Sequence, residues 1–260
     1  MPIVTILEKL YGSYSSITFE KICSNLIIGL KAQLSFAGTT DRGWIQLDVS
    51  GADETAALSL LDCEIGLVPN SLDNFKKFSV MQGKIIFSNT SAKKFYVDLG
   101  LHSPNVCDAV VSDKLLHAQL TDGKKIPHNK LVDLFCLYDN FPLQVKIYED
   151  VMVGNETVKA KLSENQLSFF KRCIGSRFDR LIILGSLFSD VERAVKLSRH
   201  SRDIIRIESL GMLEHVVLCK LGTDAVGLIP KIGRSLKTAV LVPLSPKKII
   251  ETLGSESFDC

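Results

Sequence analysis

One strand-like segment of the chain carries an aromatic and a basic side chain in a pattern that suits nucleic acid. In the segment 94–100, the apolar residues Phe95 and Val97 alternate with Lys94 and Tyr96. Successive side chains of a strand point to opposite faces, so Lys94 and Tyr96 share the outer face. An exposed aromatic ring can stack on a base, and a lysine attracts phosphate. The pattern therefore places an aromatic ring and a basic group together on one outer strand face.

The segment 143–148 repeats this alternation, with Lys146 and Tyr148 on its outer face. We expect Tyr96 and Tyr148 to stack on RNA bases. The lysines expected to attract phosphates are Lys84, Lys93, Lys94 and Lys146. The alternative for Tyr96 is an ordinary exposed aromatic residue on a strand.

Charge is distributed unevenly along the 260 residues, although the net charge is only +2. Residues 1–74 hold 4 basic and 9 acidic residues, residues 75–150 hold 10 and 8, and residues 151–260 hold 17 and 12. Arginine dominates the basic cluster of the last segment, and guanidinium groups suit phosphates. We expect Arg193, Lys196, Arg199 and Arg202 to extend the RNA-binding surface. A solvated helix face with internal ion pairs is the alternative.

Catalytic and metal-binding patterns do not stand out. The five histidines are scattered, without the close spacing of a metal site. Asp98, Asp108 and Asp113 could gather at one end of a barrel, but we expect exposed loop charges there rather than an acid–base pair. Without a nucleotide-binding loop, the sequence predicts no cofactor, no metal and no enzymatic activity.

The elements that must position these residues fall into three segments. Residues 1–74 predict an acidic α+β domain, with strands over 4–11 and 44–49 and helices over 17–34 and 52–63. Residues 75–150 contain short strands and turn-rich loops, which indicate a small barrel. Residues 151–158 are expected to form a turn or linker.

Residues 151–260 predict a basic domain that opens with a helix over 163–173. Strand and helix signals then follow in the order β-α-β-β-α-β, which is the ferredoxin-like plan. The fold class expected is thus α+β, with three small domains: an OB-like β-barrel at the centre and an α+β domain and a ferredoxin-like domain on either side. Each domain is expected to have its own packed core.

The central segment resembles the opening of S1-type OB-fold RNA-binding domains. A glycine-started strand, Met81-Gln82-Gly83-Lys84-Ile85-Ile86, precedes the aromatic-Val-Asp-hydrophobic-Gly segment 95–100. The resemblance implies an OB barrel in which Tyr96 is the exposed aromatic and His102 lies in a loop beside the groove. Ala92-Lys93-Lys94 replaces the family's usual Gly-aromatic-Gly, so one stacking residue is missing.

The final third resembles an uncharacterised archaeal protein family of unknown function. The resemblance is carried by the segments 202–205, 210–214 and 219–233, which include Leu210-Gly211-Met212 and Gly222-Thr223-Asp224. It implies an archaeal source and supplies no activity.

Seven cysteines, an odd number without close pairs, indicate free thiols in a reducing cytoplasm. We expect no signal peptide and no membrane span. The sequence therefore predicts a non-catalytic, cytoplasmic RNA-binding protein that could belong to a ribonucleoprotein. The alternative is a protein-interaction adaptor or scaffold that does not bind nucleic acid.

Overall fold

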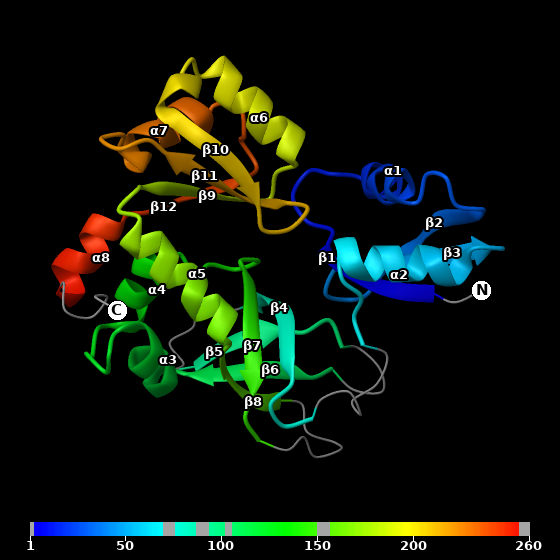
Figure 1. The fold of residues 1–260 in the computed structure, drawn as a ribbon, viewed down its shortest axis with the longest axis horizontal. Coiled ribbons are helices and arrows are strands. Elements are labelled where there is room, and N and C mark those ends of the chain that lie inside the picture. The colour runs from blue at the N-terminus through cyan, green and yellow to red at the C-terminus, as the bar shows by residue number, and fades with distance from the viewer. Residues whose placement is uncertain (1–2, 70–75, 87–93, 102–105, 150–156, 255–260) are drawn as a thin grey trace.

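A computed structural model describes residues 3–69, 76–86, 94–101, 106–149 and 157–254. These residues form a mixed α+β structure with a closed five-stranded barrel. Along the chain, one antiparallel sheet precedes the barrel strands and a second antiparallel sheet follows them. We call residues 3–69 the N-terminal unit and residues 180–244 the C-terminal unit. Figure 1 shows the barrel below the C-terminal unit, with the N-terminal unit beside both.

The N-terminal unit is a three-stranded sheet with two helices. Its elements are β1 (Ile3–Lys9), α1 (Ser16–Leu26), β2 (Ala32–Thr39), β3 (Trp44–Gly51) and α2 (Glu54–Glu64). The strand order is β1-β3-β2, and Leu67 forms an isolated bridge to Ile6 at the free edge of β1. The helix expected over 17–34 ends at Leu26, and β2 follows it. Gly29 has a left-handed backbone, which a helix does not accommodate.

The barrel closes because its first strand pairs with its fourth. Its elements are β4 (Val80–Ile86), β5 (Lys94–Asp98), β6 (Asp108–Ser112), α3 (Asp113–Leu120), α4 (His128–Phe135), β7 (Pro142–Ile147) and β8 (Thr157–Leu162). The strand order around the barrel is β4-β5-β6-β8-β7, and β6 and β8 run parallel. Phe95 and Val97 on β5 and Val145 on β7 are buried, as the alternation predicted.

Two features of the barrel differ from the expectation. Strand β8 lies beyond residue 150, where we expected the barrel to end, and pairs with β6 and β7. Its buried residues Val158, Ala160 and Leu162 alternate with polar ones, which is the pattern of a half-buried strand. Helices α3 and α4 also interrupt the segment in which we expected only short strands.

The C-terminal unit confirms the expected β-α-β-β-α-β order. Its elements are β9 (Arg180–Leu184), α6 (Phe188–Leu197), a 3₁₀ turn (Ser201–Asp203), β10 (Ile204–Ser209), β11 (Glu214–Cys219), α7 (Ala225–Ile232) and β12 (Val240–Leu244). The helix α5 (Glu164–Gly175) precedes it, and Ser163 caps α5 by accepting a hydrogen bond from the Gln166 N–H. The helix α8 (Pro246–Leu253) follows β12. Pro246 is the first residue of this helix, a position that proline favours.

The two sheets share one strand order. The C-terminal sheet is ordered β10-β11-β9-β12, with all neighbours antiparallel. In the N-terminal unit, β1, β2 and β3 take the places of β9, β10 and β11, and the Ile6–Leu67 bridge takes the place of β12. The chain thus repeats an architecture without repeating a sequence.

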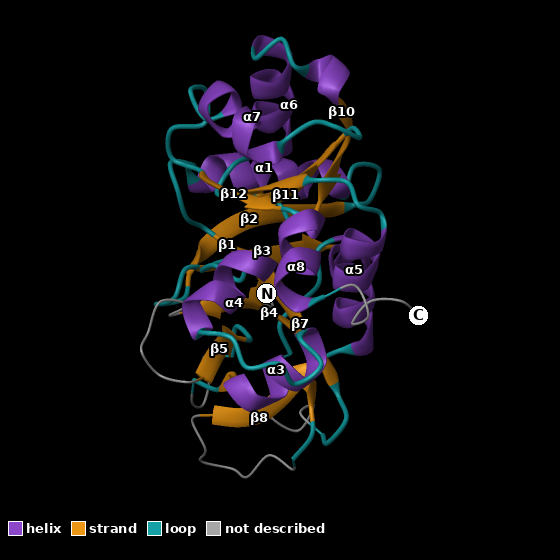
Figure 2. Cartoon of the chain, turned by 90° about the vertical axis from the view of Figure 1, so that its left-hand side faces the viewer, coloured by secondary structure: helices purple, strands orange, loops and turns teal. Residues whose placement is uncertain are grey.

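The hydrophobic cores do not separate into one core for each expected domain. One core joins the barrel interior and α5 to a face of the C-terminal sheet through Ile182, Val216 and Val242. The other face of that sheet packs against α6 and α7 through Leu181, Ile183 and Val217. Figure 2 shows the sheet between these layers. Both faces of the C-terminal sheet are therefore covered.

Within the part of the chain that the structure describes, no helix is long and apolar enough to span a membrane.

Candidate nucleic-acid interface

The outer surface of β5 and β6 holds the principal residues predicted from the sequence. Lys94 is exposed and Tyr96 is half-buried, while Phe95 between them points into the barrel. Tyr96 lies opposite Val110 on β6, and Val110 lies opposite Lys159 on β8. One aromatic ring thus sits on an outer surface that also carries exposed lysines.

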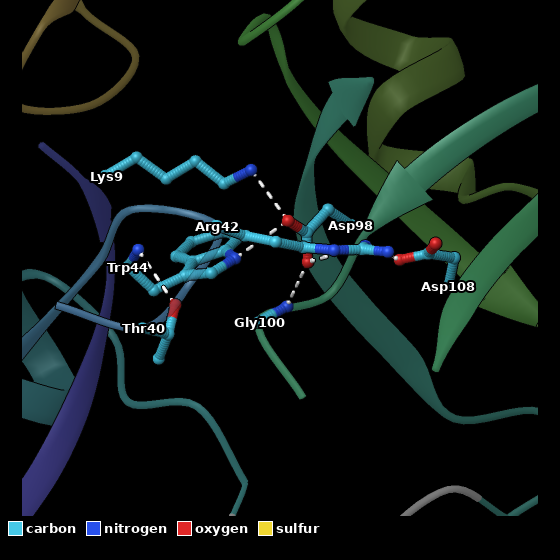
Figure 3. A network of polar contacts seen from close by, with 7 residues as sticks. All are labelled: Lys9, Thr40, Arg42, Trp44, Asp98, Gly100 and Asp108. Atoms are coloured by element: carbon cyan, nitrogen blue, oxygen red, sulfur yellow. Dashed lines mark hydrogen bonds and ion pairs between the residues drawn. The ribbon is translucent and has the colours of Figure 1, made fainter. Parts of the chain in front are cut away.

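The N-terminal unit covers one end of this surface. Asp98 and Asp108 lie opposite each other on β5 and β6. The buried Asp98 carboxylate accepts hydrogen bonds from Lys9 Nζ at 2.6 Å and Trp44 Nε1 at 2.9 Å. Arg42 donates to Asp108 at 2.5 Å. Figure 3 shows these side chains around Asp98. These contacts fix the N-terminal unit to the barrel.

Two cations balance two carboxylates in this network. Burial lowers the pKa of Lys9, and the neighbouring Asp98 carboxylate opposes that shift. Burial likewise raises the pKa of Asp108, whereas its hydrogen bond to Arg42 lowers it. We expected Asp98 and Asp108 to be exposed loop charges, which is wrong, because both are buried under the N-terminal unit. Their arrangement joins two parts of the protein.

Lys84 does not attract phosphate on the surface, contrary to the expectation. Its side chain is 3% exposed, and its Nζ lies 2.7 Å from Glu8 on β1 and 2.7 Å from Glu214 on β11. Tyr11 donates a hydrogen bond to Glu214, and the Met212 N–H donates to Glu8 at 2.7 Å. Lys84 is therefore the centre of a buried ionic cluster between three parts of the protein.

The buried cluster holds two carboxylates against one ammonium. Burial raises the pKa of Glu8, although the nearby Lys84 ammonium opposes this shift and Glu214 adds to it. Burial lowers the pKa of Lys84, but the two carboxylates outweigh it and leave that pKa raised. Lys84 therefore stays charged, and Glu8 binds its proton more tightly than a free glutamate does.

The backbone approaches this cluster closely at Gly211. A Cβ atom at that position would collide with the side-chain oxygens of Glu214 and Glu8. The adjacent Met212 N–H reaches Glu8 because of this close approach. Glycine is the residue that allows the β10–β11 turn to cover the two carboxylates.

Two of the remaining predicted barrel residues, Lys146 and Tyr148, do not lie beside Tyr96. Lys146 and Tyr148 extend from β7, and β7 is not a neighbour of β5 in the barrel order. Lys146 Nζ lies 3.3 Å from Glu164 on α5. Lys93 and His102 lie outside the described residues. Tyr148 therefore does not lie on a strand next to that of Tyr96, and its stacking on RNA stays a prediction.

The four basic residues predicted to extend the surface are exposed, and two of them have acidic partners. Arg193 pairs with Asp190, and Lys196 lies 3.1 Å from Glu192 on the same helix. Arg199 and Arg202 are exposed, and neither has an ion pair with another described residue. The surface is thus basic but partly neutralised.

Sequence reasoning missed Lys159 and Trp44. Lys159 is exposed on β8 and forms a 3.1 Å ion pair with Glu149. The alternation of Val158, Ala160 and Leu162 was the signal for its strand. Trp44 is fully buried, and its contact with Asp98 has no signal in the local sequence, because the two residues are 54 positions apart.

A cavity of about 760 Å³ lies at the junction of the units, with Glu8, Phe188 and His215 among its lining residues. His215 is buried, its Nδ1 lies 3.1 Å from Ser209 Oγ, and its Nε2 has no hydrogen-bond partner in the described part of the chain. Burial lowers the pKa of His215. No group of three or more potential metal ligands occurs among the residues described.

The fold and this surface define a mixed α+β protein built around a closed barrel. Residues 178–243, from just before β9 into β12, match the DUF2110 C-terminal domain, an uncharacterised domain family. This match agrees with the resemblance of the final third to an uncharacterised family. No curated protein matches the chain.

Proposed function

We propose that the protein binds unpaired RNA without catalysis, on the outer surface of β5 and β6. The proposal treats the barrel as OB-like and the two flanking sheets as ferredoxin-like units. OB barrels bind oligonucleotides on their second and third strands, which correspond here to β5 and β6. The covered faces of the C-terminal sheet leave the barrel as the better candidate for base contacts.

The position of Tyr96 is the observation that carries the proposal. Its ring is partly exposed on the second strand of the barrel, with the exposed Lys94 two residues before it. Stacking of a base on an aromatic ring is tolerant of sequence, and a nearby ammonium attracts the phosphate backbone. We therefore expect binding with little base preference.

The network at Asp98 limits the length of this surface. Arg42 and Trp44 cover the end of β5 and β6 where Asp98 and Asp108 lie. A nucleic-acid strand on these strands would stack on Tyr96 and then leave the barrel toward β8. A single stacking residue implies modest affinity, to which Arg199 and Arg202 would add non-specific attraction.

The test is a fluorescence anisotropy titration of labelled single-stranded oligoribonucleotides. Tyr96→Ala should weaken binding by about 1 to 3 kcal/mol, and Tyr96→Phe should retain most of the affinity because the ring remains. Phe78→Ala is the matched control, since Phe78 is 63% exposed and lies outside β5 and β6. Equal affinities for Tyr96→Ala and the wild type would refute the proposed surface.

A protein-interaction adaptor is the rival proposal. It predicts that protein purified from its native host elutes in a larger complex whose size does not change after RNase treatment. The RNA proposal predicts absorbance at 260 nm that comigrates with the protein and disappears after the same treatment.

A further inference from the structure

A hollow of about 430 Å³ lies between the N-terminal and C-terminal units. Its walls come from the β1–α1 connection, from α6 and from the segment between α7 and β12. The side chains that matter for its chemistry are Ser13, Arg193, Arg234, Ser235, Lys237 and Thr238. None of its lining residues belongs to the barrel, so the hollow is separate from Tyr96.

Three cations line this hollow, against one carboxylate. Arg234 and Lys237 are exposed, and neither forms an ion pair with any residue described. Arg193 pairs with Asp190, which is the acidic residue of the lining. The hollow therefore has a surplus of two positive charges.

Hydroxyl groups also line the hollow. Ser13 Oγ lies 3.3 Å from Thr238 Oγ1, so the two units meet at this point. The Tyr14 hydroxyl donates to Asp190 at 2.6 Å and accepts from the Leu187 N–H at 3.0 Å. These bonds hold the β1–α1 connection against the start of α6 and give the hollow a defined wall.

We infer that this hollow binds a phosphate group carried by a small polar ligand or by the end of an RNA strand. A guanidinium donates two parallel hydrogen bonds to phosphate oxygens, and an ammonium adds a point charge. Serine and threonine hydroxyls can donate to the remaining oxygens. The volume lies within the range of small-molecule sites, so part of the molecule that carries the phosphate fits with it.

The test uses isothermal titration calorimetry with inorganic phosphate, AMP and adenosine as probes. The wild type should bind phosphate and AMP but not adenosine. The double variant Arg234→Gln/Lys237→Gln should bind AMP at least about tenfold more weakly, because it loses hydrogen bonds to a charged group. Both residues are exposed, and circular dichroism melting checks that the variant is folded.

The control removes the same charges elsewhere. Lys171 and Arg172 are exposed on α5 and do not line the hollow. Lys171→Gln/Arg172→Gln should bind AMP like the wild type. Equal losses in the two double variants would contradict the proposal, as would a wild type that binds neither phosphate nor AMP at millimolar concentration.

Oligoribonucleotides with and without a 5′-phosphate distinguish the two sources of the group. A terminal phosphate in RNA should raise affinity in the wild type and not in Arg234→Gln/Lys237→Gln. AMP binding without any effect of the 5′-phosphate would assign the hollow to a free ligand. The inference does not depend on RNA binding at the barrel, because no lining residue of the hollow belongs to the barrel. Tyr96→Ala should therefore leave AMP affinity unchanged.

Discussion

The ammonium of Lys84 on β4 lies 2.7 Å from a carboxylate oxygen of Glu214 on β11, 130 residues further along the chain. Glu8 on β1 is at the same distance from that ammonium. One side chain of the barrel thus binds both flanking units. The relative placement of the three parts depends on this cluster and on the contacts of Asp98.

Lys84→Met should reduce the free energy of unfolding by about 3 to 5 kcal/mol, because it leaves two buried carboxylates without their cation. Urea denaturation followed by circular dichroism measures the change. Lys146→Met is the matched control: Lys146 also pairs with a glutamate, but Glu164 is 86% exposed. The control should cost about 1 kcal/mol or less. Similar losses in both variants would show that the Lys84 cluster contributes no more than a surface pair.

Glu8→Gln tests the raised pKa of Glu8. The folded protein binds this proton more tightly than the unfolded chain, whose carboxyl has an ordinary pKa of 4.5. The stabilisation from Glu8 is therefore present below pH 4.5 and is lost as pH rises through the raised pKa. Glutamine cannot ionise, so the stability of the wild type relative to Glu8→Gln should fall as pH rises above 4.5. Unfolding curves over a pH series give the free energy of unfolding of both proteins at each pH. A difference between the two proteins that did not change with pH would contradict this prediction.

Trp44→Phe should destabilise the protein by about 1.5 to 3 kcal/mol, because Asp98 is buried and loses a donor. Chemical denaturation should be monitored by circular dichroism. Tryptophan fluorescence is unsuitable, because Trp44 is the single tryptophan of the chain and the variant lacks it. Tyr138→Phe is the control, because it removes a hydrogen bond to Asp133 at an exposed position. If Trp44→Phe lost no more stability than the control, the hydrogen bond from Trp44 to Asp98 would not be one of the contacts that hold the N-terminal unit.

Gly211→Ala should lower stability because its methyl group would collide with the carboxylates of Glu8 and Glu214. Gly175→Ala is the matched change, since nothing lies within 4 Å of its added methyl group. Alanine is favoured over glycine in a helix by about 0.5 to 1 kcal/mol, so that control should be neutral or stabilising. Thermal melting of both variants gives the comparison, and equal melting temperatures would contradict a close approach at Gly211.

Local alternation was sufficient to predict the outer face of β5, because neighbouring residues determine which way a strand side chain points. The same alternation places Lys84 on the outer side, opposite Asp98. Which part of that surface is covered depends on Glu8 and Glu214, which lie 76 and 130 residues away. No local pattern contains that information, so the burial of Lys84 could not be predicted.

Two strands were missed for different reasons. Strand β2 consists mainly of small and polar residues, and Leu34 is its one buried residue, so its signal was weak. Strand β8 has clear alternation, but it follows a turn-like segment that was interpreted as a domain linker. The β-α-β-β-α-β order was predictable because its strands and helices carry local apolar patterns. Asp224, which accepts from the Val226 N–H, also marks the start of α7.

Ultraviolet crosslinking of a single-stranded oligouridylate to the purified protein, followed by mass spectrometry of tryptic peptides, tests the RNA-binding proposal most directly. We expect a nucleotide adduct on Tyr96, in the peptide of residues 95–114, and its loss in Tyr96→Ala. Crosslinks confined to peptides outside the barrel, or no crosslink at saturating RNA, would contradict the assignment of β5 and β6 as the RNA-binding surface.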